Sequence, residues 1–144
     1  MWRYFNGGCR VRRIWLGLIV AVSGQGVLAQ DVDCTKAEAQ VEMTYCAEQD
    51  WNAADVDLNQ AYKAAIQMLK DVDAALPMAD RGAVDSLRQA QRYWITFRDN
   101  ACAAEGYPMH GGTAEPMVIY GCRARLTRER TEGLSYITDL GDGN

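Results

Sequence analysis

The sequence predicts an all-α protein: a small up-and-down domain of about three helices, tied by two disulfides. Three observations lead to this prediction. Apolar residues recur at spacings of three and four through long segments, which is the period of a helix. No stretch alternates apolar and polar residues for long enough to predict a strand. Four cysteines, Cys34, Cys46, Cys102 and Cys122, follow a segment with the composition of an export signal, and exported proteins commonly form disulfides.

Residues 1–29 have the three parts of a signal peptide. Residues 1–13 contain four arginines and no acidic residue, residues 14–22 are uncharged and mostly apolar, and residues 27–29 end in a small side chain. We expect cleavage after Ala29, leaving a single domain of residues 30–144 in the periplasm or outside the cell. Residues 23–30, directly after the apolar run, contain no cysteine that could be lipidated, so we expect no membrane anchor after cleavage. The pair Arg12-Arg13 leaves twin-arginine export open beside the general route.

The charge balance narrows the class of partner. Four of the fifteen basic residues and none of the nineteen acidic residues lie in the predicted signal, so the remainder carries a formal charge of −8. An acidic domain is a poor ligand for nucleic acid, because phosphates require clustered lysine and arginine. It favours rapid encounter with basic partners at low salt.

The four cysteines that follow the signal permit three pairings. Two local loops, 34–46 and 102–122, are the simplest choice, and each would stabilise the fold by about 3 kcal/mol. A metal site is not expected, because the sequence has no Cys-x-x-Cys pair and its single histidine is His110.

The first predicted helix begins near residues 35–38, where Thr35 and Glu38 have the spacing of a capping box. It extends to about residue 71, without proline or glycine. Its apolar stripe comprises Trp51, Ala54, Leu58, Ala61, Ala65, Leu69 and Val72. The pattern allows either one long helix or two helices with a bend near Asp50.

Pro77 and Gly82 interrupt the helical pattern, and a second helix is predicted over residues 83–104. Its apolar face comprises Val84, Leu87, Ala90, Trp94, Phe97 and Ala101. Residues 106–113 form a glycine-rich loop. In the third predicted helix Thr113 is the cap and Pro116 lies in the first turn. One side of it comprises Ile119, Cys122, Leu126, Gly133 and Ile137, and we expect the tail from Asp139 onward to fray.

A set of motif residues covers about residues 34–134. It comprises Cys34, Glu42, Met43, Cys46, Ala54, Asp55, Leu58, Asn59, Tyr62, Gln91, Trp94, Phe97, Arg98, Asp99, Cys102, Gly111, Gly112, Cys122, Thr127 and Arg130. In this set the chain resembles the N-terminal domain of LprI-type lysozyme inhibitors of bacterial envelopes. The resemblance implies a helical, disulfide-tied domain outside the cytoplasm, inhibition of lysozyme as an activity, and a largely structural role for the motif. The chain differs from the family's namesake in lacking a lipidation cysteine.

The loop between Cys102 and Cys122 is the first candidate for a partner-binding site. In or beside it lie Glu105, Tyr107, His110 and Glu115. A short loop that is closed by a disulfide and carries acidic and aromatic side chains could enter the cleft of a basic wall hydrolase. Ordering the loop in advance would reduce the entropy lost on binding. The alternative is a plain connection between helices.

Two further groups have a functional and a structural interpretation. Gln91, Trp94, Arg98 and Cys102 share one helical face. They are either a binding hot spot or a structural face, with Trp94 in the core and Arg98 paired with Glu42, Asp55 or Asp99; we favour the second. The run of Arg123, Arg125, Arg128 and Arg130 either binds an anionic polymer or phosphate or is a solvated face paired with the acidic first helix. We again favour the second.

The sequence offers little for catalysis. A lone histidine in a glycine-rich loop makes no Ser-His-acid arrangement, and paired cysteines leave no free thiol. We therefore expect no enzyme activity and no cofactor. The leading hypothesis is a protein that binds and blocks a lysozyme-like muramidase. The alternative is an envelope interaction or ligand-binding module without lysozyme activity.

Overall fold

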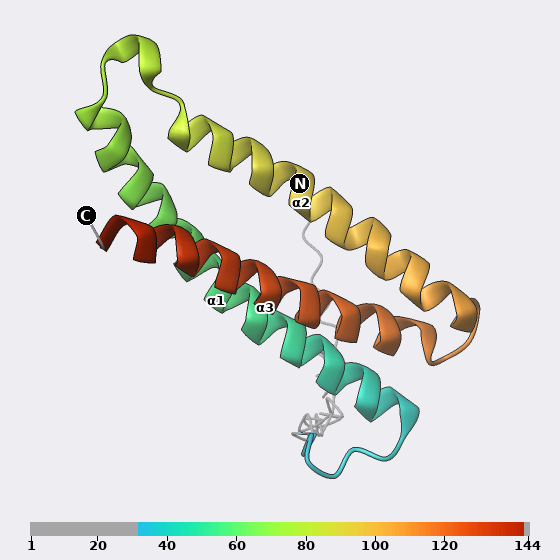
Figure 1. Ribbon diagram of the computed structural model, residues 1–144. Coiled ribbons are helices and arrows are strands. Elements are labelled where there is room, and N and C mark those ends of the chain that lie inside the picture. Colours follow the sequence, from blue (N-terminus) through green and yellow to red (C-terminus); the bar gives the residue numbers. More distant parts are fainter. Residues whose placement is uncertain (1–31, 143–144) are drawn as a thin grey trace, which may run out of the picture. The chain divides into compact units, whose positions relative to one another are not determined.

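The computed structural model describes residues 32–142 of the 144-residue chain. In these residues it contains three α-helices, α1 (Gln40–Ala75), α2 (Ala83–Gly106) and α3 (Glu115–Asp142), and two short 3₁₀ helices, η1 (Met78–Asp80) and η2 (Tyr107–Met109), with no strand. The all-α prediction is therefore confirmed. The direction of the chain reverses at each connection, so α1 and α3 lie side by side and α2 runs opposite to both (Figure 1). The predicted signal peptide and its cleavage site lie outside the described residues.

The start of α1 differs from the predicted capping box. Thr35 donates hydrogen bonds from its backbone N–H and its hydroxyl to the Asp33 carboxylate, at 3.0 and 2.7 Å, and does not cap the helix. The carboxylate of Glu42 in the first turn accepts from the N–H groups of Glu38 and Ala39, each at 3.3 Å. Donors at a helix start need such acceptors, because no preceding turn supplies them. From there α1 is one continuous helix of 36 residues, without a bend into two.

One carboxylate links the end of α1 to the start of α2. Pro77 disfavours helical backbone at the residue before it. The helix α1 ends at Ala75, two residues before Pro77 and four residues beyond the predicted end. Asp73, in the last turn of α1, then accepts hydrogen bonds from the N–H groups of Gly82, Ala83 and Val84, at 3.0, 3.0 and 3.1 Å. A side chain of α1 thus caps the start of α2.

The core lies along the line where the three helices meet. It consists of the buried side chains of Leu58, Ala65, Leu87 and Leu134, with Ala61, Tyr62, Ile66, Leu69, Trp94 and Ile137 packed against them. Each fully buried leucine stabilises the fold by about 2 kcal/mol. Of the helix pairs, α1 and α3 make the most extensive contact and α1 and α2 the least. The helix α2 is therefore the most loosely covered of the three.

Several residues of the predicted apolar stripes are exposed, namely Val72 in α1, Ala90 and Phe97 in α2, and Gly133 in α3. Three helices cover only a narrow stripe of one another, so apolar positions at its flank stay in solvent. In α2 the inner stripe passes through Leu87, Trp94 and Arg98. As a result Arg98 is only 7% exposed, whereas its apolar neighbour Phe97 is 60% exposed.

The second half of the chain is more helical than predicted. The helix α2 continues to Gly106, and η2 occupies part of the predicted loop. Ala114, not Thr113, directly precedes α3, and its carbonyl accepts from the N–H of Val118 at 3.1 Å. Pro116 lies in the first turn, as predicted. The helix α3 continues to residue 142, so the expected fraying from residue 139 is wrong over the part that the structure describes.

Both predicted disulfides are present. Cys34 is bonded to Cys46 and ties the segment before α1 to that helix, and Cys102 is bonded to Cys122 and joins α2 to α3. Within residues 32–142, no helix combines the length and the apolar character needed to cross a membrane.

Candidate functional site

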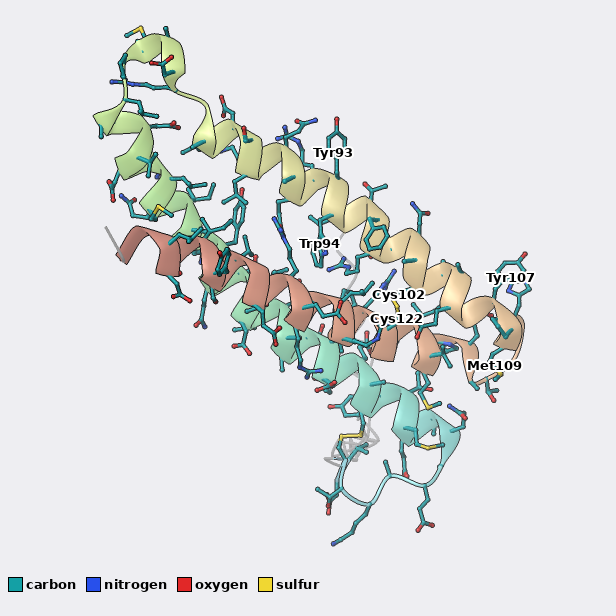
Figure 2. The ribbon with its side chains drawn as sticks, viewed as in Figure 1. Tyr93, Trp94, Cys102, Tyr107, Met109 and Cys122 are labelled. Carbon is teal, nitrogen blue, oxygen red and sulfur yellow. A yellow bond between two sulfur atoms is a disulfide. The ribbon has the colours of Figure 1, made fainter. Side chains whose placement is uncertain are left out.

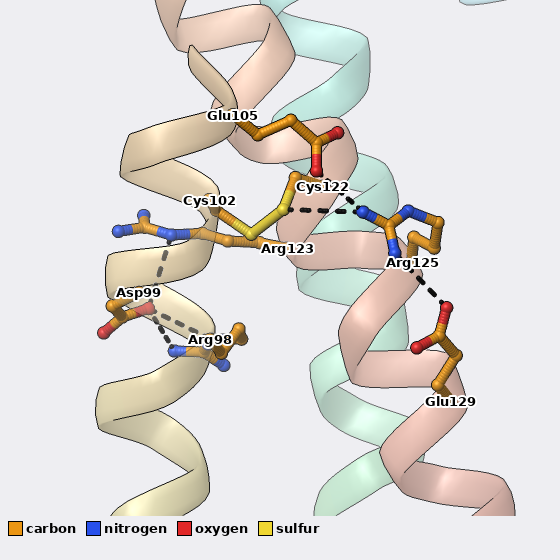
Figure 3. The surroundings of a disulfide bond; sticks show 8 residues. All are labelled: Arg98, Asp99, Cys102, Glu105, Cys122, Arg123, Arg125 and Glu129. Carbon is orange, nitrogen blue, oxygen red and sulfur yellow. Dashed lines mark hydrogen bonds and ion pairs between the residues drawn. A yellow bond between two sulfur atoms is a disulfide. The ribbon is translucent and has the colours of Figure 1, made fainter. Parts of the chain in front are cut away.

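The end of the bundle where α2 turns into α3 is closed tightly. The Cys102–Cys122 disulfide lies between the two helices and both cysteines are buried (Figure 3). One turn later Gly106 lies so close to Ile119 that a Cβ on the glycine would be 2.6 Å from the isoleucine Cγ1. The ends of α2 and α3 that carry the connecting loop are therefore held close together.

The connecting loop is ordered by Glu115, the first residue of α3. Its carboxylate accepts from the N–H of Gly111 at 2.8 Å and lies 3.0 Å from Nδ1 of His110. These two contacts, with the histidine contact the larger, lower the pKa of the Glu115 carboxyl below its usual value. Gly111 has a φ of 76°, in the left-handed region that other residues rarely adopt. The loop thus has a defined conformation.

The outer side of this loop presents an aromatic pair. The ring of Tyr107 stacks on that of His110, with centroids 4.8 Å apart and an angle of 4° between the planes. Tyr107 is 68% exposed and Met109 is 49% exposed. Figure 2 shows both side chains at the far end of the bundle, away from its core. Exposed aromatic and methionine side chains on an ordered support are typical of protein-binding surfaces.

Of the four predicted site residues, three come together and one does not. Tyr107, His110 and Glu115 form the connected group just described. Glu105 belongs to the last turns of α2 and pairs with Arg125 at 2.8 Å (Figure 3). The sequence did not predict Met109 as a site residue, because its exposure depends on the turn that η2 makes.

An apolar hollow lies at the same end of the molecule. It has a volume of about 490 Å³ and is lined by Gln40, Val41 and Thr44 of α1 and by Thr113 and Pro116 beside the loop. Sequence patterns did not indicate it, because it forms between segments more than 60 residues apart. Together with Tyr107 and Met109, it adds apolar surface to this end.

The arginine run of α3 is used mostly within the fold. Arg123 contacts Asp99 at 3.4 Å and lies over the Trp51 ring. Arg125 pairs with Glu129 in addition to Glu105. Arg128 pairs with Asp50 and Arg130 donates to Gln91 at 3.0 Å. Burial lowers the pKa of Arg130. Of these arginines only Arg128 forms an ion pair with α1, as the structural interpretation predicts, because α2 supplies most of the partners.

The face of Gln91, Trp94, Arg98 and Cys102 also makes contacts within the fold. The Arg98 guanidinium contacts Asp99 at 3.0 Å and Asp55 at 3.8 Å, two of the three predicted acids. It lies 5.2 Å from the Trp94 ring centroid and 5.4 Å from that of Trp51. Ion pairs and cation–π contacts of this kind offset the loss of hydration of a buried arginine.

Among residues 32–142, no three histidine, cysteine or acidic side chains lie together in a way that could hold a metal ion.

Comparisons with known proteins agree with this architecture. The model of the family described as "Lysozyme inhibitor LprI" matches residues 33–134. The chain belongs to this family. The structure is also similar to the crystal structure of a DUF1311 family protein of Pseudomonas putida KT2440, with a TM-score of 0.59 and 25% identity, over 75% of this chain and 97% of that one. DUF1311 denotes the same family.

Two curated relatives are similar in sequence. An uncharacterized protein of Rhizobium meliloti (strain 1021), R02472, is 40% identical over 113 residues, which are 76% of this chain and 81% of that protein. The uncharacterized protein YecT of Escherichia coli (strain K12) is 33% identical over 58 residues, 40% of this chain and 36% of YecT. The family membership and the two disulfides are consistent with an exported protein.

Proposed function

We propose that this protein binds and blocks a lysozyme-like muramidase, using the ordered loop between α2 and α3. We place it in the periplasm or outside the cell, after cleavage of the signal peptide at Ala29, where such enzymes act on the wall. The protein acts in this proposal as a binding partner and not as an enzyme. The family description supports the target, and the geometry of the loop supports the site.

The observation that carries the proposal is the exposed Tyr107–His110 stack on a loop fixed from behind. The disulfide fixes the helices, and the carboxylate of Glu115 fixes the loop backbone. A loop with this support loses little entropy when it enters a cleft. The formal charge of −8 outside the predicted signal favours encounter with a basic hydrolase.

A turbidity assay of wall lysis with purified, oxidised residues 30–144 tests the proposal. We expect inhibition at near-stoichiometric protein. Tyr107→Ala should reduce the potency about tenfold or more, since an aromatic side chain that becomes buried on binding is a typical hot spot of an interface. The matched control is Tyr136→Ala, because Tyr136 is similarly exposed, at 63%, but lies near the other end of α3.

The salt dependence separates specific from unspecific inhibition. Raising the salt from about 0.01 M to 0.15 M should weaken inhibition by both the wild type and Tyr107→Ala, because steering is screened. The ratio of their potencies should stay unchanged. Inhibition that responds to salt but not to Tyr107→Ala would show unspecific charge pairing and would contradict the loop as the site.

A further inference from the structure

A second hollow lies between α1 and α2, and it shares no residue with the loop. It has a volume of about 550 Å³, within the range of about 300–1,000 Å³ that is usual for small-molecule sites. Its polar lining includes Asp55 and Tyr62 of α1 and Arg88, Gln91 and Arg92 of α2, and Leu58 supplies apolar surface. We call this hollow the α1–α2 cleft.

The sign of charge in the α1–α2 cleft is opposite to that of the whole protein. Three arginines, Arg88, Arg92 and Arg98, line it with a single carboxylate, that of Asp55. Arg98 is committed to the fold, because Asp55 and Asp99 both contact it. The charge that remains for a ligand is therefore that of the other two arginines.

Arg88 and Arg92 lie one helical turn apart on the same side of α2. The partner of Arg88 is Asp85 at 3.2 Å, in a pair whose side chains are 50% and 85% exposed. Such an exposed pair is weak and exchanges readily with another anion. Arg92 donates to the neutral amide of Gln89, and no carboxylate among the described residues pairs with it. Two neighbouring guanidinium groups suit an oxyanion, which accepts several of their parallel N–H bonds.

The rest of the α1–α2 cleft defines the body of the ligand. Leu58 and Ile95 line the cleft with apolar side chains, and Ile95 is the more exposed of the two, at 42%. The Asn59 amide nitrogen donates to the backbone and carboxylate oxygens of Asp55, at 2.7 and 2.9 Å, which holds this wall in place. The cleft thus combines a cationic rim with an apolar floor.

We propose that the α1–α2 cleft binds a small organic anion through a carboxylate or phosphate group held by Arg88 and Arg92. This proposal does not depend on muramidase inhibition. The presence of the cleft favours a ligand-binding role for the domain. A molecule with an apolar ring beside the oxyanion should bind better than the bare ion.

The test is an NMR titration of the full domain with inorganic phosphate, phenyl phosphate and benzoate as probes. We expect saturable shifts of the Arg Nε–H signals and of the side-chain amides of Asn59 and Gln91, with phenyl phosphate or benzoate binding more tightly than inorganic phosphate. The variant R88Q/R92Q should weaken the binding about tenfold or more. Its control is R81Q, because Arg81 is exposed, lies outside the cleft and donates to the Leu76 carbonyl.

The outcomes decide the proposal. Binding lost in R88Q/R92Q and kept in R81Q supports it, and the preference between phenyl phosphate and benzoate assigns the oxyanion. Absence of saturation below about 10 mM for all three probes would overturn it, as would equal binding by the wild type and R88Q/R92Q. The backbone amide spectrum of each variant reports whether it folds, so a loss of binding is not confused with a loss of structure.

Discussion

The two connections between helices use the same device but are built differently. At each, a carboxylate at a helix end accepts hydrogen bonds from backbone N–H groups: Asp73 at the α1–α2 connection and Glu115 at the α2–α3 connection. Only the second connection also has a disulfide and a close helix contact at Gly106. The first has neither, and the α1–α2 cleft opens between the helices that it joins.

This difference matches the two roles that we propose. Where the backbone is joined covalently, the outer side chains are free to be apolar and exposed, as Tyr107 and Met109 are. Where no covalent bond joins the helices, a carboxylate that accepts backbone hydrogen bonds makes the connection, and the α1–α2 cleft lies between them. The α2–α3 end suits binding of a large rigid partner, and the α1–α2 side suits a small ligand.

The largest expected effect is the loss of the α2–α3 disulfide. Replacing Cys102 and Cys122 by alanine should reduce the free energy of unfolding by about 3 kcal/mol, because the bond closes a loop of about 20 residues in the unfolded chain. Urea unfolding measures the change. The matched control replaces Cys34 and Cys46, which close a loop of about 12 residues.

The control pair should cost less than the α2–α3 pair. Cys102 and Cys122 are buried, so their replacement also removes packing, whereas Cys34 is exposed. Equal losses for the two pairs would contradict the view that the α2–α3 end is the more tightly built one.

The parts of the fold that depend on local pattern could be predicted from the sequence. The helix-breaking Pro77, the three helical segments and the pairing of neighbouring cysteines are of this kind. The partners of Arg98 were also predicted in part, because Asp99 is its neighbour in the chain and Asp55 belongs to the same motif. The grouping of Tyr107, His110 and Glu115 could also be predicted, because these loop residues are close to one another in the sequence.

Features that depend on which stripe of a helix meets another could not be predicted. Hydrophobicity alone places Phe97 inside and Arg98 outside, and the structure has the reverse. The arginine is buried because acids and tryptophan rings from both α1 and α2 surround it. Its pairing with Asp55 and Asp99 was among the predicted alternatives, but its position over the Trp51 ring was not. The same holds for Asp73, whose hydrogen-bonding partners lie nine to eleven residues away across a turn, and for the α1–α2 cleft.

The next effect in size concerns the close contact at Gly106. Gly106→Ala should lower the free energy of unfolding by about 1–2 kcal/mol, because its Cβ would lie 2.6 Å from Cγ1 of Ile119 and the isoleucine must shift. Gly133→Ala is the control, since that glycine is also helical but has open space around it. It should gain about 1 kcal/mol from the better helix propensity of alanine. Thermal unfolding followed by circular dichroism distinguishes the two, and changes of the same sign would contradict the close approach.

The smallest effect tests the connection that has no disulfide. The N–H groups of Gly82, Ala83 and Val84, in that order of effect, lower the pKa of Asp73 in the folded protein. A carboxyl whose pKa is lowered on folding stabilises the protein fully above its unfolded pKa of about 3.9, and this contribution is lost as the pH falls through the folded pKa. Asp73→Asn should therefore be less stable than the wild type at pH 7, by less than the loss from the disulfide.

The difference in the free energy of unfolding between the two proteins should shrink as the pH falls below about 4, because Asp73 is then protonated and uncharged, as asparagine is. Urea unfolding of both proteins between pH 7 and pH 3 measures it. The carboxyls of Asp33 and Glu115, whose pKa values are also lowered, are present in both proteins and cancel from the difference. A difference that stays constant over this range would mean that Asp73 stabilises the connection through its shape and hydrogen-bond geometry and not through its charge. The contrast between a covalent and an electrostatic connection would then fail.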